Sequence, residues 1–267
     1  MFMGDIKTIG QWERVRLRWA LAAHVAPYLV WVGVIVLLQA AEKFTEVPRI
    51  ALAWSYAAKT VVCGALLLWL RPWLYDKGKN TCATFLPLAI LVGVAVAVLW
   101  VLPETPWVAA HWPGFHAFYN TWLIMMPGQM PSYYDAFFFP SPPPSHPSLA
   151  YSPEVCGWGL TIMKLIGTTL VIATAEEYFF RGFLYRWLRE SNFVKVSPRV
   201  YDAPVFWVVV LVFAVEHDRW LGGAMAGAAY GWLAVRTGSV RPAVVAHALT
   251  NFLLGVYVVL SKQYGFW

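Results

Sequence analysis

Long apolar runs recur along this chain, and their length is the strongest constraint on its fold. A run of about 20 apolar residues can cross a bilayer as a helix. A helix also satisfies its own backbone hydrogen bonds where no water is present. The sequence therefore predicts an all-α polytopic transmembrane helical bundle of about seven (6–8) membrane helices. The expected helices are 19–41, 50–70, 84–102, 158–181, 203–216, 221–235 and 242–260, of which the fifth and sixth are short.

Composition and charge agree with a membrane protein and argue against a nucleic-acid partner. Hydrophobic residues make up 60% of the 267 residues and charged residues only 13%, whereas soluble domains carry about 25% charged residues. The net charge of +6 is explained by cytoplasmic loops, which collect Lys and Arg. With a cytoplasmic N-terminus and alternating helices, 13 Lys and Arg fall in inner segments and 4 in outer ones. We therefore expect a multi-pass protein of the cell (inner) membrane, surrounded by lipid bilayer.

The chain is expected to form a single integral-membrane domain, 1–267. Residues 1–157 hold the N-terminal helices and a long external segment, 103–157, which has no Lys or Arg. An interfacial or re-entrant helix is expected at 111–126, and the proline run at 140–144 excludes regular helix. We interpret this segment as a structural cap on the bundle, with a lid over a lateral opening as the alternative. Lys59 and Lys164 are expected to extend their ammonium groups toward the interface.

Three membrane helices each carry polar residues in an i, i+4 pattern, which places both members of each pattern on one helix face. The pairs belong to the patterns Glu176-Glu177-x-x-x-Arg181, Phe213-x-x-x-His217 and His247-x-x-x-Asn251. A single pair of this kind is more often packing or a contact between helices. Three pairs on separate helices, one of them with a double carboxylate, favour a site inside the bundle.

These residue types suit hydrolysis by an activated water. Glu176 with His217 could bind and deprotonate a water, because a partly desolvated carboxylate is a better base. His247 and Asn251 could donate hydrogen bonds to an oxyanion. Glu177 and Arg181 would pair and orient Glu176. A variant holds Zn²⁺ with Glu176, His217 and His247, since three such ligands and a water make a catalytic zinc site.

The three patterns in this order resemble the CPBP (Abi) family of intramembrane proteases, which includes the type II CAAX prenyl endopeptidases. The stretch from Gly227 through 231–239 to Asn251 is similar to the family's C-terminal signature, and the resemblance covers about residues 158–255. It implies a glutamate-type endopeptidase without an obligatory metal, acting on a membrane-associated protein or peptide. The implied catalytic residues are Glu176, Glu177, Arg181, His217, His247 and Asn251.

Two other classes stay open at this stage. A non-catalytic protein of the same fold, with a bacteriocin-immunity or scaffolding role, would tolerate replacement of the motif residues. A small transporter would use the intramembrane charges as a proton relay. The substrate is not identified, and prenylated C-termini and secreted precursors both fit. The helix layout also predicts that His217 lies at the outer end of its helix, away from Glu176 and His247.

Overall fold

The computed structural model describes residues 10–76, 78, 81–124 and 147–267, and these residues form helices and no strand. Five stretches are long and apolar enough to cross a membrane, and a further apolar helix is shorter. The all-α membrane bundle is therefore confirmed, but the number of full-length spans is below the seven expected. The five stretches are Gln11–Glu42, Arg49–Tyr75, Ala83–Glu104, Pro153–Trp187 and Arg241–Ser261, and the shorter helix is Ala203–Val215.

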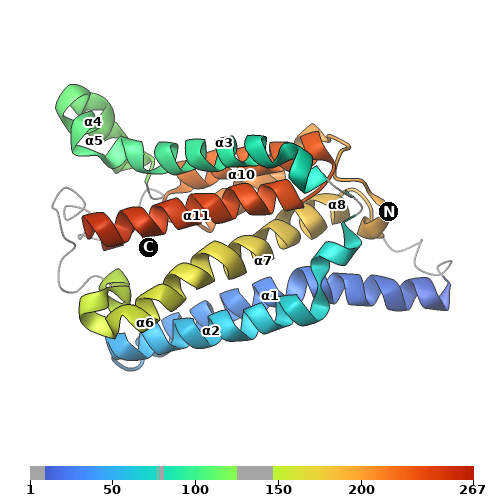
Figure 1. Cartoon of the computed structure of the whole chain (residues 1–267), viewed down its shortest axis with the longest axis horizontal. Coiled ribbons are helices and arrows are strands. Elements are labelled where there is room, and N and C mark those ends of the chain that lie inside the picture. Colours follow the sequence, from blue (N-terminus) through green and yellow to red (C-terminus); the bar gives the residue numbers. More distant parts are fainter. Residues whose placement is uncertain (1–9, 77, 79–80, 125–146) are drawn as a thin grey trace.

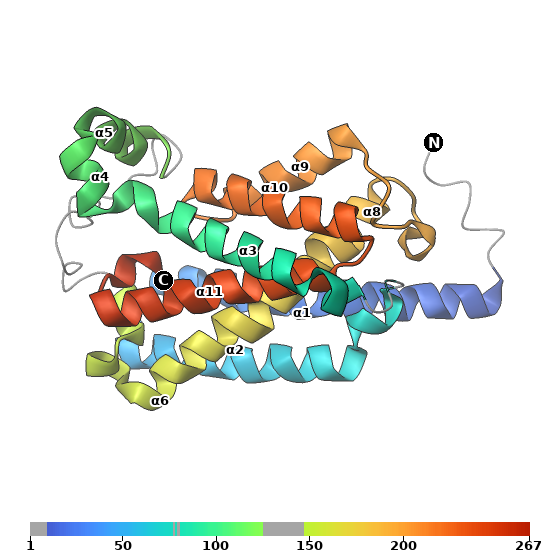
Figure 2. The same ribbon diagram turned by 45° about the horizontal axis from the view of Figure 1, so that its top comes forward.

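The helices run back and forth along one common direction (Figure 1). α1 packs on α2, α9 on α10, and α11 along α3. In the turned view α3 lies over α10 and α11 (Figure 2). The principal helices are α1 (Gln11–Glu42), α2 (Arg49–Leu70), α3 (Thr81–Val101), α6 (Pro153–Ile166), α7 (Ala173–Glu177), α8 (Tyr185–Trp187), α9 (Ala203–Val215), α10 (Trp220–Thr237) and α11 (Arg241–Ser261).

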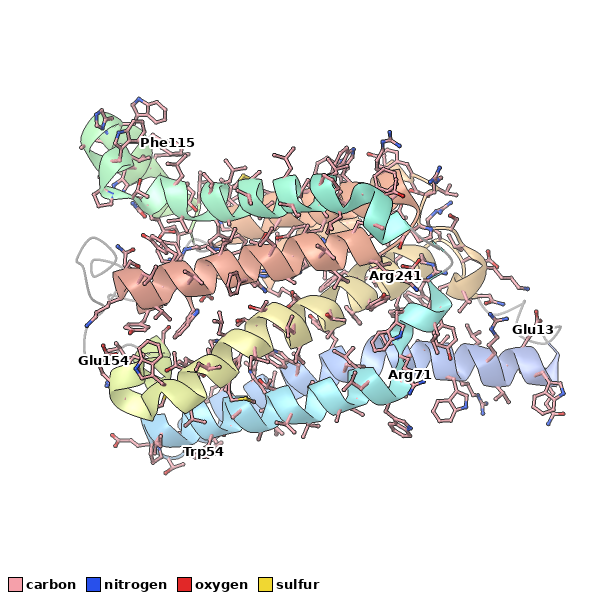
Figure 3. All side chains as sticks on the ribbon, in the orientation of Figure 1. Glu13, Trp54, Arg71, Phe115, Glu154 and Arg241 are labelled. Carbon is pink, nitrogen blue, oxygen red and sulfur yellow. The ribbon has the colours of Figure 1, made fainter. Side chains whose placement is uncertain are left out.

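Charged residues labelled in Figure 3 lie at both ends of the bundle. Arg71 and Arg241 lie toward one end, and Glu154 and Phe115 lie at the other (Figure 3). Both arginines were expected on the inner side. Which of the two ends faces the cytoplasm stays a prediction.

The membrane-spanning stretch that carries the double carboxylate is not a uniform α-helix. Between α6 and α7 the chain forms a π-helix over Gly167–Ile172, and a second π-helix, Tyr178–Leu184, separates α7 from α8. π-Helical turns are rare and occur frequently at functional sites. The two wide turns flank the five residues of α7, which end with Glu176 and Glu177.

Glycines allow close approach where the central helices cross. A Cβ at Gly167 would lie 2.4 Å from Thr60 Oγ1 of α2, and one at Gly93 of α3 would lie 2.6 Å from the Ala246 oxygen of α11. Small residues at such crossings are typical of membrane bundles, because backbone contact replaces the hydrophobic effect between helices. One crossing thus holds the stretch 153–187 against α2, and the other holds α3 against α11.

The loop between α9 and α10 explains why the expected position of His217 is wrong. α9 ends at Val215 after only 13 residues, and Glu216, His217 and Asp218 of the loop that follows line the central cavity. Arg219 of this loop is buried and donates to both carboxylate oxygens of Glu104, at 2.5 and 2.8 Å. The backbone N–H of Trp220 donates to the Ile124 oxygen at 3.1 Å. Arg219 is therefore paired with Glu104 of the external segment, while Asp218 and His217 line the cavity.

The helix expected over 111–126 is present but shorter, and another short helix precedes it in the external segment. They are α4 (Pro106–His111) and α5 (Pro113–Trp122). The contacts of Glu104 and Ile124 with the α9–α10 loop support its interpretation as a cap. The proline run at 140–144 lies outside the described residues.

The two membrane lysines do not extend to the interface as expected. Lys59 and Lys164 are only 6% and 8% exposed. Each ammonium group lies against aromatic rings inside the bundle. By contrast, large apolar side chains such as Leu68, Leu91 and Leu211 are exposed on the outside, as lipid contact requires.

Candidate active site

The second glutamate of the pair is the centre of a buried polar network. The Glu177 side chain is 0% exposed, and its Oε1 accepts hydrogen bonds from Arg181 Nη1 at 2.9 Å and from His247 Nδ1 at 2.9 Å. The expected i, i+4 pair of Glu177 and Arg181 is thus present. The other oxygen, Oε2, has no hydrogen-bond partner among the described residues.

Arg181 fixes this network to a third helix. Its Nη2 donates to the Gly227 oxygen of α10 at 2.8 Å. Its guanidinium carbon lies 4.5 Å from the centre of the Phe213 ring of α9. A planar guanidinium can pair with a carboxylate and stack on a ring together, so this position suits Arg better than Lys. The network therefore joins the stretch 153–187 to α9, α10 and α11.

His247 is oriented from two sides. Its Nδ1 bonds to Glu177, and its ring stacks on Tyr230 with centroids 4.8 Å apart and planes 19° apart. Since the carboxylate accepts, Nδ1 carries a proton in this contact. The opposite nitrogen, Nε2, lies 3.6 Å from Glu176 Oε2. His247 therefore presents Nε2 toward the first glutamate.

Glu176 faces a cavity instead of the network. Its side chain is 12% exposed, and it lines a cavity of about 700 Å³. Successive helix residues point about 100° apart, which explains why the neighbouring carboxylates have different surroundings. His217, His247 and Asn251 line the same cavity, whereas Glu177 and Arg181 do not.

A second carboxylate stands beside Glu176 in the cavity wall. One ligand atom each of Glu176, Glu216 and His217 lies within 4.8 Å of the other two. Two hydrogen bonds of about 2.8 Å span up to about 5.6 Å, so one water could touch all three groups. Two carboxylates this close repel each other, and sharing one proton relieves the repulsion. The tyrosine hydroxyl of Tyr28 donates to Glu216 Oε2.

The sequence predicted Glu216 as the last residue of an apolar helix and predicted no catalytic role for it. The available signal was a carboxylate directly before the motif histidine at the end of an apolar run. This carboxylate can take part in the site because the chain directly after α9 lines the cavity.

The histidine of this cluster is also held in one orientation. His217 Nδ1 lies 2.7 Å from the Phe213 oxygen one turn earlier. A carbonyl oxygen can only accept, so Nδ1 carries the proton, and in the neutral ring Nε2 can accept a proton or bind a metal. The i, i+4 spacing read from the sequence is thus used to orient the ring.

Asn251 lies one turn beyond His247 on α11. Its Nδ2 donates to the Thr168 oxygen in the π-helical stretch at 2.9 Å. An amide nitrogen carries two N–H bonds, so one remains for a ligand in the cavity. All six residues singled out from the sequence therefore lie in one region, four of them on the cavity wall and two in the adjoining network.

The donor set of the cluster is compatible with a divalent metal. Two carboxylates and one imidazole are ligand types that zinc uses in catalytic sites. The Nδ1 contact of His217 with a backbone oxygen is the second contact that metal-bound histidines usually make. The group on the described residues contains Glu216 in place of His247, which the sequence had suggested as the third ligand.

Comparison with protein families matches the second part of the chain. Residues 158–253 match the family described as "Type II CAAX prenyl endopeptidase Rce1-like", and the match supports the CPBP resemblance. The matched segment runs from α6 to α11 and contains all six motif residues. Searches of curated proteins and of solved structures found no significant match.

Proposed function

We propose that this protein, whose motif-bearing segment falls in the CAAX prenyl endopeptidase family, is an intramembrane endopeptidase that uses a water activated by Glu176 and His217. The family match supports a protease of this type. The observation that carries the mechanism is the cluster of Glu176, Glu216 and His217 on the wall of a cavity inside a membrane bundle. The proposed substrate is a membrane-associated protein or peptide.

In the proposed reaction the water oxygen attacks the carbonyl carbon of the scissile peptide bond. Glu176 takes the water proton as general base while His217 Nε2 accepts the second hydrogen bond of the water. The carbon–nitrogen bond of the tetrahedral intermediate then breaks, and the proton passes from Glu176 to the leaving amine. Glu216, held by Tyr28, is a second acid in reach of the same water and could supply or store that proton.

The negative oxygen of the intermediate needs donors on the opposite side of the substrate. Asn251 has one N–H available, and His247 donates from Nε2 when both of its nitrogens are protonated. Its contact with Glu177 holds the ring in place with Nε2 toward the cavity. In this proposal Glu177 and Arg181 act by positioning His247 and do not touch substrate.

A metal-dependent version is favoured by the same cluster. Glu176, Glu216 and His217 would hold Zn²⁺, which would supply Lewis-acid activation of the water. Elemental analysis of protein purified without chelators separates the two versions. Zinc near one equivalent, lost from Glu216→Gln, would support the metal, and metal-free protein with full cleavage activity would exclude it.

The proposal is tested by a mass-spectrometric census of protein termini in host cells. Cells that express wild type are compared with cells that express Glu176→Gln at equal level. New termini found only with wild type would identify a peptidase and its substrate together. Identical termini in both, with the wild-type protein present in the membrane, would contradict the proposal and favour a non-catalytic role.

A further inference from the structure

The far wall of the same cavity carries two buried lysines. Lys59 comes from α2 and Lys164 from α6. Lys59 Nζ lies 4.4 Å from the ring centres of Trp31 and Tyr56, and Lys164 Nζ lies 4.1 Å from that of Tyr56. The two ammonium groups therefore share one tyrosine ring.

No anion compensates these charges in the part of the chain that the structure describes. Neither lysine forms an ion pair or donates a hydrogen bond there. Cation–π contacts offset only part of the cost of burying a cation. The hydroxyl of Tyr56 is also buried without a hydrogen-bond partner. This wall thus offers two ammonium groups and a phenol hydroxyl as donors, with no carboxylate paired to them among the described residues.

We propose that this wall binds a carboxylate group of the peptide substrate. A carboxylate has acceptors only, and ammonium groups and a phenol hydroxyl satisfy it by charge-assisted hydrogen bonds. The group belongs to the substrate because Lys59 and Lys164 line the cavity that Glu176 and His217 line. The inference therefore rests on the proposed function and adds a specificity determinant to it.

The geometry of the stretch 153–187 relates the two walls. Lys164, Thr168, Ile172 and Glu176 all line the cavity at intervals of four residues. The π-helix over Gly167–Ile172 has wider turns than an α-helix, which helps to keep residues four apart on one face. Twelve residues at about 1.5 Å rise span no more than about 18 Å. An extended peptide covers about 3.3 Å per residue, so the bound carboxylate lies up to about five residues from the cleaved bond.

The test measures peptide binding, so that it does not depend on cleavage. The probes are apolar eight-residue peptides of Ala, Leu, Val and Phe in three forms: with a free C-terminal carboxylate, with a C-terminal amide, and with the amide and one Asp. Dissociation constants are measured calorimetrically with full-length Glu176→Gln protein in detergent micelles. We expect an acidic form to bind at least about tenfold tighter than the plain amide. The two acidic forms show whether a chain terminus or a side chain supplies the carboxylate.

Matched variants assign the effect to this wall. In Lys59→Met with Lys164→Met the preference for the acid should fall below about threefold, while Lys59→Arg should retain part of it. The control Lys195→Met removes an exposed lysine, 57% exposed, and should keep the full preference. Loss of two uncompensated buried charges should leave the thermal midpoint unchanged or higher, which excludes misfolding as the cause.

Three results would overturn this inference. The first is equal binding of the acid and the amide peptides. The second is an acid preference that the double Met variant retains. The third is a phospholipid that wild type binds and the double Met variant does not, while peptide binding is the same in both. In each case cleavage by wild type, seen in the census of termini, would leave the proposed function standing. Absence of new termini with intact acid preference would instead contradict only the proposed function.

Discussion

Glu176 and Glu177 are neighbours in the chain but occupy opposite environments. Glu177 is fully buried and bonded to Arg181 and His247 at 2.9 Å each. Glu176 is 12% exposed, faces a cavity, and has His247 Nε2 no closer than 3.6 Å. One carboxylate is thus occupied by protein partners, while the other is available to a ligand.

The difference shows that a step of one residue, about 100° around the helix axis, can separate a carboxylate that positions other side chains from one that faces a ligand. A buried ion pair costs more to break than it contributes, because removal of one partner leaves an uncompensated charge. A carboxylate on a cavity wall can lose its charge with little effect on folding. Changes in the network are therefore expected to affect stability, and changes on the cavity wall to affect rate.

The largest expected effect comes from breaking the network. Arg181→Met leaves Glu177 buried without its cation, and we expect a loss of about 3–5 kcal/mol in the free energy of unfolding. Denaturant unfolding in micelles measures it. The matched control Arg236→Met removes an exposed arginine at the end of α10 and should leave the midpoint unchanged. Equal midpoints for both variants would contradict the assigned role of Glu177 and Arg181.

Asn251→Ala tests the side of the cavity that would hold the oxyanion. Removal of one oxyanion donor is expected to lower kcat by about 10²–10³-fold with little change in KM. The thermal midpoint should change little, since the amide makes one hydrogen bond in the described structure. Asn192→Ala, in the loop before α9, is the control. An unchanged kcat would remove Asn251 from the reaction.

Glu216→Gln tests whether the second carboxylate takes part. We expect kcat to fall by about 100-fold, the lower range for a group that moves a proton, while folding is preserved. Full activity of this variant would show that Glu176 and His217 suffice. Loss of bound zinc together with activity would transfer Glu216 from proton transfer to metal binding.

Tyr28→Phe should give the smallest effect. It removes the hydroxyl that donates to Glu216 but keeps the ring, which stacks on Phe179 at 4.1 Å. We expect kcat to fall by about tenfold at most, because one hydrogen bond to a charged group is lost. Tyr201→Phe, at an exposed tyrosine, serves as the control. A loss as large as that of Glu216→Gln would assign the tyrosine a direct role.

Much of this architecture can be predicted from the sequence because membrane helices leave a local signal. The apolar runs predicted the helices, and the three i, i+4 pairs predicted that Glu176, His217, His247 and Asn251 would share one region. Both predictions depend only on helix periodicity and on the cost of polar groups in a bilayer.

Other features depend on tertiary contacts that no local pattern contains. The sequence predicted the end of α9 to within one residue, at 216 against the observed Val215. It did not show the buried contact between Arg219 and Glu104, which are 115 residues apart, or that Glu216 beside this contact lines the cavity. The π-helical turns around α7 arise within an apolar run that reads as ordinary helix. The sequence predicts Lys59 and Lys164 as interfacial lysines, because it does not show that both residues line one cavity.

The central claim is that the two neighbouring glutamates divide chemistry from positioning, and one paired measurement tests it most directly. Glu176→Gln and Glu177→Gln are purified in parallel, and substrate cleavage and thermal unfolding are measured on the same samples. We expect Glu176→Gln to lose at least about 10³-fold in cleavage with an unchanged midpoint, and Glu177→Gln to unfold several degrees earlier, by about 4 °C or more. If both variants lose stability equally, or if Glu176→Gln still cleaves at the wild-type rate, the claim is wrong.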